Sequence, residues 1–345
     1  MEKCGVGANN PPNFNPEIAT PTFFVKNKHK WRMVHDYKRL NEESKDIIYP
    51  IPLIATIIES LKGKKYFSLI DLKSGYYQFQ LSERAKNLCA VISPRGIFRF
   101  DCLPMGLKNA PPFFQRVMDR ILKDGLNIYV FVYIDDIVVF SESFQEHLGH
   151  LSLVLDCLRE ANLKANIEKC NFCLSQLRVL GKVISSEGIR TDPDLVESMI
   201  NYPIPTSARK VKGFLPMLNY YREHLENYDP KTEPLAALAR DDFRWDETTW
   251  KSNPEYQQCF DKLKQEMLNA PILAYPDFTK EFNIQTDASK YGAGAVLYQY
   301  DNDRRVVVSY RSWLFDKAQR NYNTTERELL ALVLATRKWK PYLKV

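Results

Sequence analysis

Two adjacent acids, Asp135 and Asp136, interrupt a long run of β-branched and aromatic residues. The flanking runs, Ile128 to Ile134 and Ile137 to Phe140, predict two strands joined by a tight hairpin with both acids at its tip. Like charges repel and apolar strands offer little solvent, so a bare pair of carboxylates is unfavourable there. A divalent cation removes that difficulty, and Mg²⁺ is commonly held by one or two carboxylates together with substrate phosphates. A simple acidic turn is the alternative interpretation.

A third acid, Asp71, ends another predicted strand, Tyr66 to Ile70. Together with the hairpin acids it completes the ligand set of a two-metal phosphoryl-transfer site. We therefore expect Asp71, Asp135 and Asp136 to be both catalytic and metal-binding, with two Mg²⁺ ions, or Mn²⁺ as the alternative. In such a site one metal activates a primer 3′-hydroxyl and the other neutralises the triphosphate and the leaving pyrophosphate.

The elements that position these acids follow from hydrophobic periodicity. Pro111 to Leu122 predicts a helix with its prolines in the first turn, where the missing N–H costs nothing. Phe144 to Asn162 predicts an amphipathic helix. Near the C-terminus three further strands are predicted, namely Phe282 to Asp287, Gly292 to Tyr300 and Val306 to Arg311.

Two helix boundaries are predicted from local signals. Pro216 lies in a helical pattern within Ser207 to Tyr228 and should end or kink that helix. Thr325 and Glu328 predict a capping box for a last helix that runs to about Lys340.

The bulk composition is that of a soluble globular protein: of 345 residues, 45% are hydrophobic and 26% are charged. The N-terminus has no apolar segment typical of a secretory signal, and no apolar run is long enough to cross a bilayer, so an intracellular setting is expected. The net charge of +6 is compatible with a polyanion partner. The segment Lys26 to Lys45 is rich in basic residues interleaved with Trp31 and Tyr37, and is either a phosphate-binding stretch or a solvated face.

The seven cysteines are irregularly spaced and odd in number, which argues against a disulfide framework. Cys170 and Cys173, with His147 and His150 upstream, allow a zinc site to be drawn. Reduced, structural cysteines are the favoured interpretation.

Six segments resemble, in family order, the motifs of the reverse transcriptases of gypsy-group long-terminal-repeat retrotransposons, encoded in retrovirus-related Pol polyproteins. They are Trp31 to Asn41 (fingers), Ser68 to Gln78 (first palm motif), Leu103 to Pro111 with Phe114 and Gln115 (second palm motif), Phe131 to Phe140 (the Y-x-D-D hairpin), Val179 to Val183 with Glu187 to Ile189 (primer grip), and Asn219 to Arg222 (thumb). The resemblance implies an α+β right-hand polymerase of fingers, palm and thumb. It also implies an RNA-directed DNA polymerase whose partners are an RNA or DNA template, a DNA primer and deoxynucleoside triphosphates.

The resemblance further implies roles for single residues. Arg32 matches a fingers arginine that contacts the incoming triphosphate, to which a guanidinium is well suited. Tyr76 stands where the family has a steric gate against the ribose 2′-hydroxyl, and a half-buried structural aromatic is the alternative. Lys169 is a candidate proton donor to pyrophosphate. The remaining implied contacts are Leu72 and Met105 for the nucleotide, and the backbone of Leu180 and Gly181 for the primer.

The C-terminal region resembles the start of the retroelement RNase H domain, through Thr286 to Ser289, Gly292 to Gly294 and Asn321 to Leu330. Asp287 and Glu326 match the first two acids of its metal site. In the family the other two acids of that site follow later in the domain, past the position of Val345. A truncated RNase H-like domain without RNase H activity is therefore expected.

These observations predict four segments: an irregular lead-in (1–17), fingers and palm (18–190), thumb or connection (191–270) and the RNase H-like domain (271–345). Several positions depart from the family pattern, namely Asn27, His35, Met105, Lys182 and Pro216. A fragment of a longer polyprotein or a decaying genomic copy is therefore expected, and dimerisation is compatible with the sequence. Two alternatives to the polymerase stay open: a nucleic-acid-binding remnant without turnover, and a metal nuclease that uses the same carboxylates.

Overall fold

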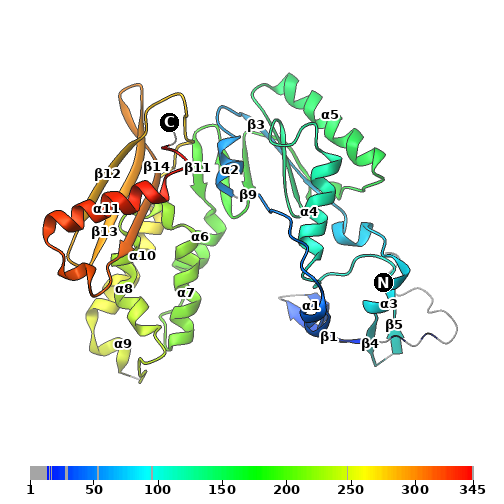
Figure 1. The fold of residues 1–345 in the computed structure, drawn as a ribbon, viewed down its shortest axis with the longest axis horizontal. Helices are drawn as coiled ribbons and strands as arrows, with labels where there is room; N and C mark the ends of the chain where they lie inside the picture. Colours follow the sequence, from blue (N-terminus) through cyan, green and yellow to red (C-terminus); the bar gives the residue numbers. More distant parts are fainter. Residues whose placement is uncertain are drawn as a thin grey trace. The chain divides into compact units, whose positions relative to one another are not determined.

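The computed structural model describes residues 14, 16, 18–27, 30–52, 54–94, 96–246 and 248–343, without the side chains of residues 27, 30, 32, 55, 56 and 59. The chain divides into two compact units (Figure 1). The first comprises Met1–Ser60 and Lys64–Ser175, and the second comprises Leu61–Gly63 and Gln176–Val345.

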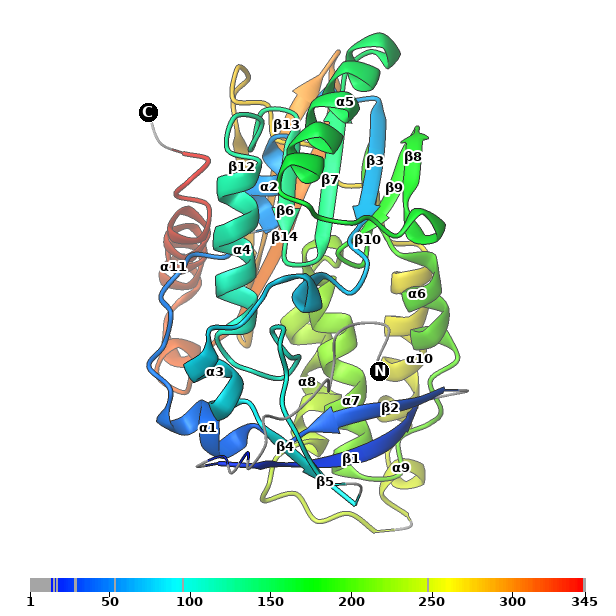
Figure 2. The same ribbon diagram turned by 90° about the vertical axis from the view of Figure 1, so that its right-hand side faces the viewer.

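The centre of the first unit is a four-stranded antiparallel sheet in the order β6-β7-β3-β8. The strands are β6 (Val130–Tyr133), β7 (Asp136–Ser141), β3 (Tyr66–Asp71) and β8 (Asn171–Leu174). Helices α4 (Ala110–Ile121) and α5 (Phe144–Glu160) lie over one face of this sheet (Figure 2). Their apolar sides and the strands form one core, which includes Ile70, Phe114, Met118, Val132, Ile137, Val139, Leu151, Val154 and Leu158. Burial of this continuous apolar surface gives the strands that carry the acids a rigid support.

A second sheet of the first unit has the order β2-β1-β4-β5. Its strands are β1 (Thr20–Asn27), β2 (Lys30–His35), β4 (Val91–Ser93) and β5 (Gly96–Phe98). The short helices of this unit are α1 (Lys38–Glu43), α2 (Ile54–Glu59), η2 (Gly75–Gln78), α3 (Glu83–Leu88) and η3 (Ile167–Lys169). A small core of Tyr37, Leu40, Cys89, Val91 and Phe100 joins α1 to this sheet.

The second unit begins with a three-stranded antiparallel sheet of β9 (Gln176–Val179), β10 (Lys182–Ser185) and β11 (Gly188–Thr191). Its helices are α6 (Pro193–Ile200), α7 (Ala208–Tyr220), η4 (Arg222–His224), α8 (Tyr228–Leu238), α9 (Thr249–Ser252) and α10 (Pro254–Leu268). They share a core that includes Val211, Phe214, Leu218, Tyr221, Leu235, Phe260 and Leu263.

The last part of the second unit is a three-stranded antiparallel sheet of β12 (Asn283–Ala288), β13 (Gly292–Asp301) and β14 (Arg304–Leu314). Helix α11 (Thr324–Lys338), which follows the turn η5 (Gln319–Asn321), packs on β12 and β13 (Figure 1). The strand β14 contacts α8 and η4, so sheet and helices of this unit form one body.

The predicted strands and long helices are confirmed, with two corrections. Helix α7 does not end at Pro216 but continues to Tyr220. The capping box of the last helix is formed by Asn323 and Glu326 rather than by Thr325 and Glu328, because the helix already begins at Thr324. That helix ends at Lys338, close to the predicted end at about Lys340.

Across the part of the chain that the structure describes, no helix is both long and apolar enough to cross a membrane.

Candidate active site

The three predicted acids lie at one end of the central sheet of the first unit. In the register of β3 and β7, Asp71 is paired directly with Asp136. Strand β6 pairs with β7 through Tyr133 and Asp136, so the hairpin turn consists of Ile134 and Asp135. Asp136 is therefore the first residue of β7 and not part of the tip, which corrects the predicted hairpin by one residue. The tight hairpin and the strand pairing bring the three acids together.

The turn that carries Asp135 is held by a side chain whose role the sequence did not reveal. Ile134 has a φ of 54°, which is unusual for a β-branched residue. The fully buried Gln115 of α4 accepts a hydrogen bond from the backbone N–H of Ile134 (2.9 Å) and donates one to the carbonyl of Val132 (2.9 Å). Its amide also donates to Asp119 (2.8 Å). The sequence placed Gln115 in the second palm motif without a role, and a polar residue on the apolar side of a predicted helix is the signal that points to one.

The electrostatics of the site favour a positive ligand. Burial, followed by the charge of Asp71, raises the pKa of Asp135, which Lys169 opposes. Burial also raises the pKa of Asp136, and the charges of Asp135 and Asp71 add to that effect. The Nζ of Lys169 lies 3.6 Å from a carboxylate oxygen of Asp71. The protein thus concentrates negative charge in a partly buried place and supplies one cation of its own.

Carboxylate oxygens are the ligands that Mg²⁺ prefers, so the chemistry of the donors fits such an ion. Among the described residues, no three His, Cys, Asp or Glu side chains are arranged as a metal-binding group. Because Mg²⁺ typically takes only one or two protein carboxylates and completes its shell with water and substrate phosphates, a converged three-ligand set is not required.

Tyr76 lies beside these acids, and its position is fixed by packing. It is only 9% exposed, and its ring stands 5.1 Å from that of Phe114. Burial, with the charge of Asp135 adding to it, raises the pKa of Tyr76 to about 12. The preceding Gly75 lies close to Phe114 and Asp135. A Cβ at this position would be 3.1 Å from the Phe114 ring and 3.4 Å from an Asp135 oxygen. This close approach explains why glycine precedes Tyr76.

The other predicted nucleotide contacts have different surroundings. Leu72 is buried and forms a β-bridge with Ala165. Met105 is 50% exposed. Arg32 belongs to β2, but its side chain lies outside the described residues.

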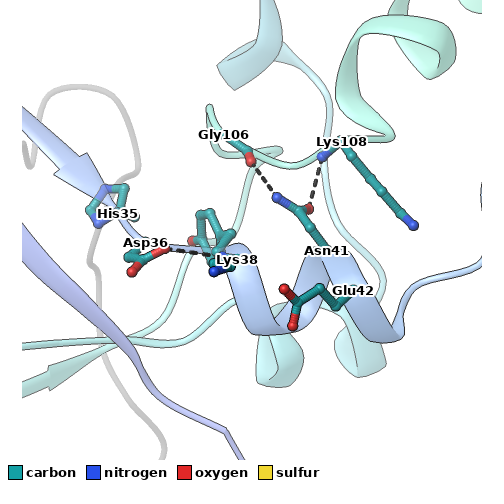
Figure 3. A pocket seen from close by; sticks show the side chains of 8 residues that line it. His35, Asp36, Lys38, Asn41, Glu42, Gly106 and Lys108 are labelled. Carbon is teal, nitrogen blue, oxygen red and sulfur yellow. Dashed lines mark hydrogen bonds between the residues drawn. The ribbon is translucent and has the colours of Figure 1, made fainter. Parts of the chain in front are cut away.

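Hydrogen bonds join the fingers motif and the second palm motif around an open pocket of about 560 Å³ (Figure 3). Asn41 of α1 donates a hydrogen bond to the carbonyl of Gly106 (2.9 Å) and accepts one from the N–H of Lys108 (2.8 Å). Lys38 and Lys108 line this pocket with Asp36 and Glu42. Two motifs more than sixty residues apart in the sequence thus form one structural part.

Known protein families match both units of the chain. Residues 24–184 match the family described as "Reverse transcriptase (RNA-dependent DNA polymerase)", and residues 252–345 match the "RNase H-like domain found in reverse transcriptase". The chain is 38% identical over 341 residues to the retrovirus-related Pol polyprotein from transposon opus of Drosophila melanogaster, covering 95% of this chain and 34% of that protein. The chain belongs to the retrovirus-related Pol family.

Other relatives agree with this assignment. The Tf2-3 transposon polyprotein of Schizosaccharomyces pombe is 35% identical over 328 residues, covering 94% of this chain and 24% of that protein. The chain thus spans at most about a third of the length of these relatives. In fold, it resembles a foamy viral protease-reverse transcriptase solved in complex with ds DNA, with a TM-score of 0.86, 22% identity, and coverage of 95% of this chain and 57% of that one. The fold is a reverse transcriptase domain followed by an RNase H-like domain.

The end of the matched reverse transcriptase region contains the two predicted primer contacts. Leu180 and Gly181 form the turn between β9 and β10, and both have left-handed backbone conformations, with φ values of 50° and 62°. They belong to the second unit, whereas the three acids belong to the first.

The two predicted acids of the RNase H-like domain are exposed. Asp287 lies near the end of β12, opposite Gly294 of β13. Glu326 lies in the first turn of α11, where its carboxylate accepts a hydrogen bond from the N–H of Asn323 (2.8 Å). Glu326 therefore caps its own helix.

The residues of the zinc alternative have other partners. The buried ring of His147 bonds to Ser68 through Nε2 (2.7 Å) and to Ser141 through Nδ1 (2.9 Å). The hydroxyl of Ser68 accepts the N–H of Cys173 (2.9 Å), so these groups tie α5 to the central sheet. Cys170 and Cys173 are free thiols.

Proposed function

We propose that this protein is an RNA-directed DNA polymerase that extends a DNA primer on an RNA or DNA template. The observation that carries the proposal is the direct pairing of Asp71 with Asp136, with Asp135 in the adjoining turn. Membership of the Pol family supports the same activity.

Asp71 and Asp135 are the residues that would hold two Mg²⁺ ions, or Mn²⁺, with Asp136 completing the acidic cluster. Bound there, the metal supplies charge neutralisation for the primer 3′-oxygen and for the triphosphate. Gln115 keeps the Asp135 turn in place, so the carboxylates are positioned before substrate arrives.

The remaining side chains select and orient the nucleotide. The ring of Tyr76, fixed against Phe114, would collide with a ribose 2′-hydroxyl and so favour deoxynucleotides. Arg32 would contact the triphosphate, Leu72 and Met105 would line the nucleotide, and Lys169 would donate a proton to pyrophosphate. Before that proton transfer, the ammonium group of Lys169 partly neutralises the charge of Asp71.

We infer that the nucleic-acid partner is a primer–template duplex. Solved structures with a similar fold include foamy viral protease-reverse transcriptase in complex with dsDNA and with an RNA/DNA hybrid. Affinity in this chain would come mainly from phosphate contacts, including the backbone of Leu180 and Gly181, and would fall steeply with salt.

We also infer that the RNase H-like domain does not cleave RNA in this chain. In support, the carboxylate of Glu326, one of the two predicted acids, is engaged in the capping box of α11. The thumb or connection would occupy residues 191–270, between residues 18–190 and the domain from 271 onward.

The test is primer extension on an RNA template with a DNA primer in Mg²⁺. Wild type is compared with Asp135→Asn and with a matched control, Asp156→Asn, an exposed acid paired with Arg159 on α5. The proposal expects extension by the wild type and the control, and none by Asp135→Asn.

A second candidate is a nucleic-acid-binding protein without turnover. The contact between Lys169 and Asp71, which places a cation where a metal is expected, favours it. Binding of the primer–template by the wild type without any extension would support this candidate and refute the polymerase. Shortening of the primer in Mg²⁺ would instead indicate a nuclease.

A further inference from the structure

The turn between β9 and β10 is a two-residue hairpin connection with an unusual composition. Val179 pairs with Lys182, and both central residues, Leu180 and Gly181, have positive φ values of 50° and 62°. Two positive φ values are typical of a type I′ turn, which usually contains Asn and Gly. The left-handed region is disfavoured for leucine because of its Cβ. Contacts from outside the turn are therefore needed to hold this conformation.

Two consecutive tyrosines at the end of α7 supply these contacts. Tyr220 donates its hydroxyl hydrogen to the carbonyl of Leu180, and Tyr221 donates its own to the carbonyl of Gly181. Both carbonyls of the turn are thus held by phenols from one helix.

Tyr221 is the anchored member of the pair. It is completely buried, and its oxygen also accepts a hydrogen bond from the N–H of Asp192 (3.3 Å), the N-cap of α6. Burial raises the pKa of Tyr221 to about 12, so the phenol stays protonated and remains a donor at neutral pH. The hairpin turn, α6 and α7 therefore meet at one hydroxyl.

Tyr220 is the exposed member, with 43% of its surface accessible. Its ring stands edge-to-face on Tyr221, with 5.0 Å between the ring centroids. It also covers Gly181 so closely that a Cβ there would lie 3.2 Å from the Tyr220 ring. Only glycine fits under this ring without displacement.

Because the peptide group is planar, the two tyrosine hydrogen bonds also set the direction of the N–H of Gly181. In a trans peptide, the carbonyl of Leu180 and the N–H of Gly181 point in opposite directions. When Tyr220 holds that carbonyl, the N–H of Gly181 is turned away from α7. Within the described residues, no chain group accepts a hydrogen bond from this N–H.

We propose that Tyr220 and Tyr221 are positioning residues that fix the Leu180–Gly181 turn so that the N–H of Gly181 faces a phosphate of the primer strand. The proposal rests on the proposed function, since it takes this turn as the primer contact. The resemblance to the thumb motif assigned no role to either hydroxyl.

The test removes each hydroxyl alone, in Tyr220→Phe and Tyr221→Phe. The matched control is Tyr202→Phe, which removes another phenol of the same unit, bonded to the carbonyl of Lys210 (2.8 Å) away from the turn. The dissociation constant for a labelled RNA/DNA primer–template is measured without nucleotides, over a series of salt concentrations.

Each variant of the pair should bind the primer–template about fivefold more weakly, as expected for one lost hydrogen bond. The slope of log affinity against log salt should stay at the wild-type value, because the lost contact comes from a neutral N–H and not from a cation. The KM for deoxynucleotides and the control Tyr202→Phe should be unchanged. A general structural defect would also raise the KM for deoxynucleotides.

Tyr221 is buried, so its replacement can also lower the stability of the fold. Tyr220 is exposed, so Tyr220→Phe removes the hydroxyl without that effect and decides the test. Wild-type affinity for the primer–template in Tyr220→Phe would overturn the proposal. Because binding is measured without turnover, a wild type that binds but does not polymerise would refute the proposed function and leave this test intact.

Discussion

Gln115 accepts a hydrogen bond from the backbone N–H of Ile134, the residue directly before Asp135. A buried amide on helix α4 thereby fixes the turn that carries one of the candidate catalytic acids.

Replacing Gln115 by methionine keeps the volume but removes these hydrogen bonds. The N–H of Ile134 and the carbonyl of Val132 then lose their partner, so we expect a loss of about 2–3 kcal/mol of unfolding free energy. Because Asp135 also loses its fixed position, the extension rate at saturating substrate should fall at least about tenfold. Urea denaturation and primer extension measure the two effects. As a control, Gln257→Met in α10, which removes bonds to Trp250 and Asp261, should keep the extension rate. A Gln115→Met variant with full activity would show that the turn needs no such support.

Removal of the Lys169 charge should make the enzyme more sensitive to acid. Burial and Asp71 raise the pKa of Asp135, and Lys169 counteracts them. In Lys169→Met that pKa rises further, so Asp135 becomes protonated at a higher pH and the acid limb of kcat/KM shifts upward. The profile is measured at subsaturating Mg²⁺, where the free carboxylates titrate. Lys169→Arg retains the charge and should retain the wild-type limb. Identical acid limbs in Lys169→Met and wild type would contradict an electrostatic role for Lys169.

Tyr76→Val tests the steric gate. We expect discrimination between deoxynucleotides and ribonucleotides, as the ratio of their kcat/KM values, to fall by about tenfold or more, because the ring no longer excludes a 2′-hydroxyl. Since Tyr76 is buried against Phe114, the variant should also lose about 2–4 kcal/mol of stability. Tyr76→Phe keeps the ring and should keep the discrimination. Unchanged discrimination in a folded Tyr76→Val would mean that the ring serves only the core.

The second unit should be destabilised by acid through His224. This side chain is 1% exposed, and burial lowers its pKa to about 4, with Lys182 adding to the effect while the Pro271 carbonyl and Glu223 oppose it. The pKa of His224 in the folded protein lies below its unfolded value of about 6.5. The contribution of neutral His224 to the free energy of unfolding is therefore fully present above pH 6.5 and is lost as the pH falls toward 4. From the size of this shift, about 2 kcal/mol should be lost between pH 7.5 and pH 5.

The measurement is urea denaturation followed by tryptophan fluorescence, since four of the five tryptophans belong to the second unit. His224→Asn keeps a donor for the carbonyl of Pro271 but cannot titrate. The variant should therefore not show the loss of unfolding free energy that His224 causes in the wild type between pH 7.5 and pH 5. An equal acid loss in both proteins would exclude His224 as the cause.

The sequence determined the elements and the candidate catalytic acids because both depend on local patterns. Runs of β-branched and aromatic residues predicted β6 and β7, short strand-like segments predicted β3 and the three strands of the RNase H-like sheet, and acids at strand ends indicated Asp71, Asp135 and Asp136. Strand-forming composition and helical spacing follow from local side-chain and backbone geometry, so they can be read without knowledge of the fold.

The tertiary structure alone decided which partners hold these acids. Gln115, nineteen residues before Ile134, fixes the Asp135 turn. The tyrosines of α7 lie forty residues after the carbonyls of Leu180 and Gly181 that they hold. Helix α11 begins earlier in the chain than predicted. Asn323 and Glu326 form the capping box that satisfies free backbone N–H groups at the helix start, in place of Thr325 and Glu328. Hydrogen bonds between distant side chains and backbone depend on how elements pack, and packing leaves no periodic signal in the sequence.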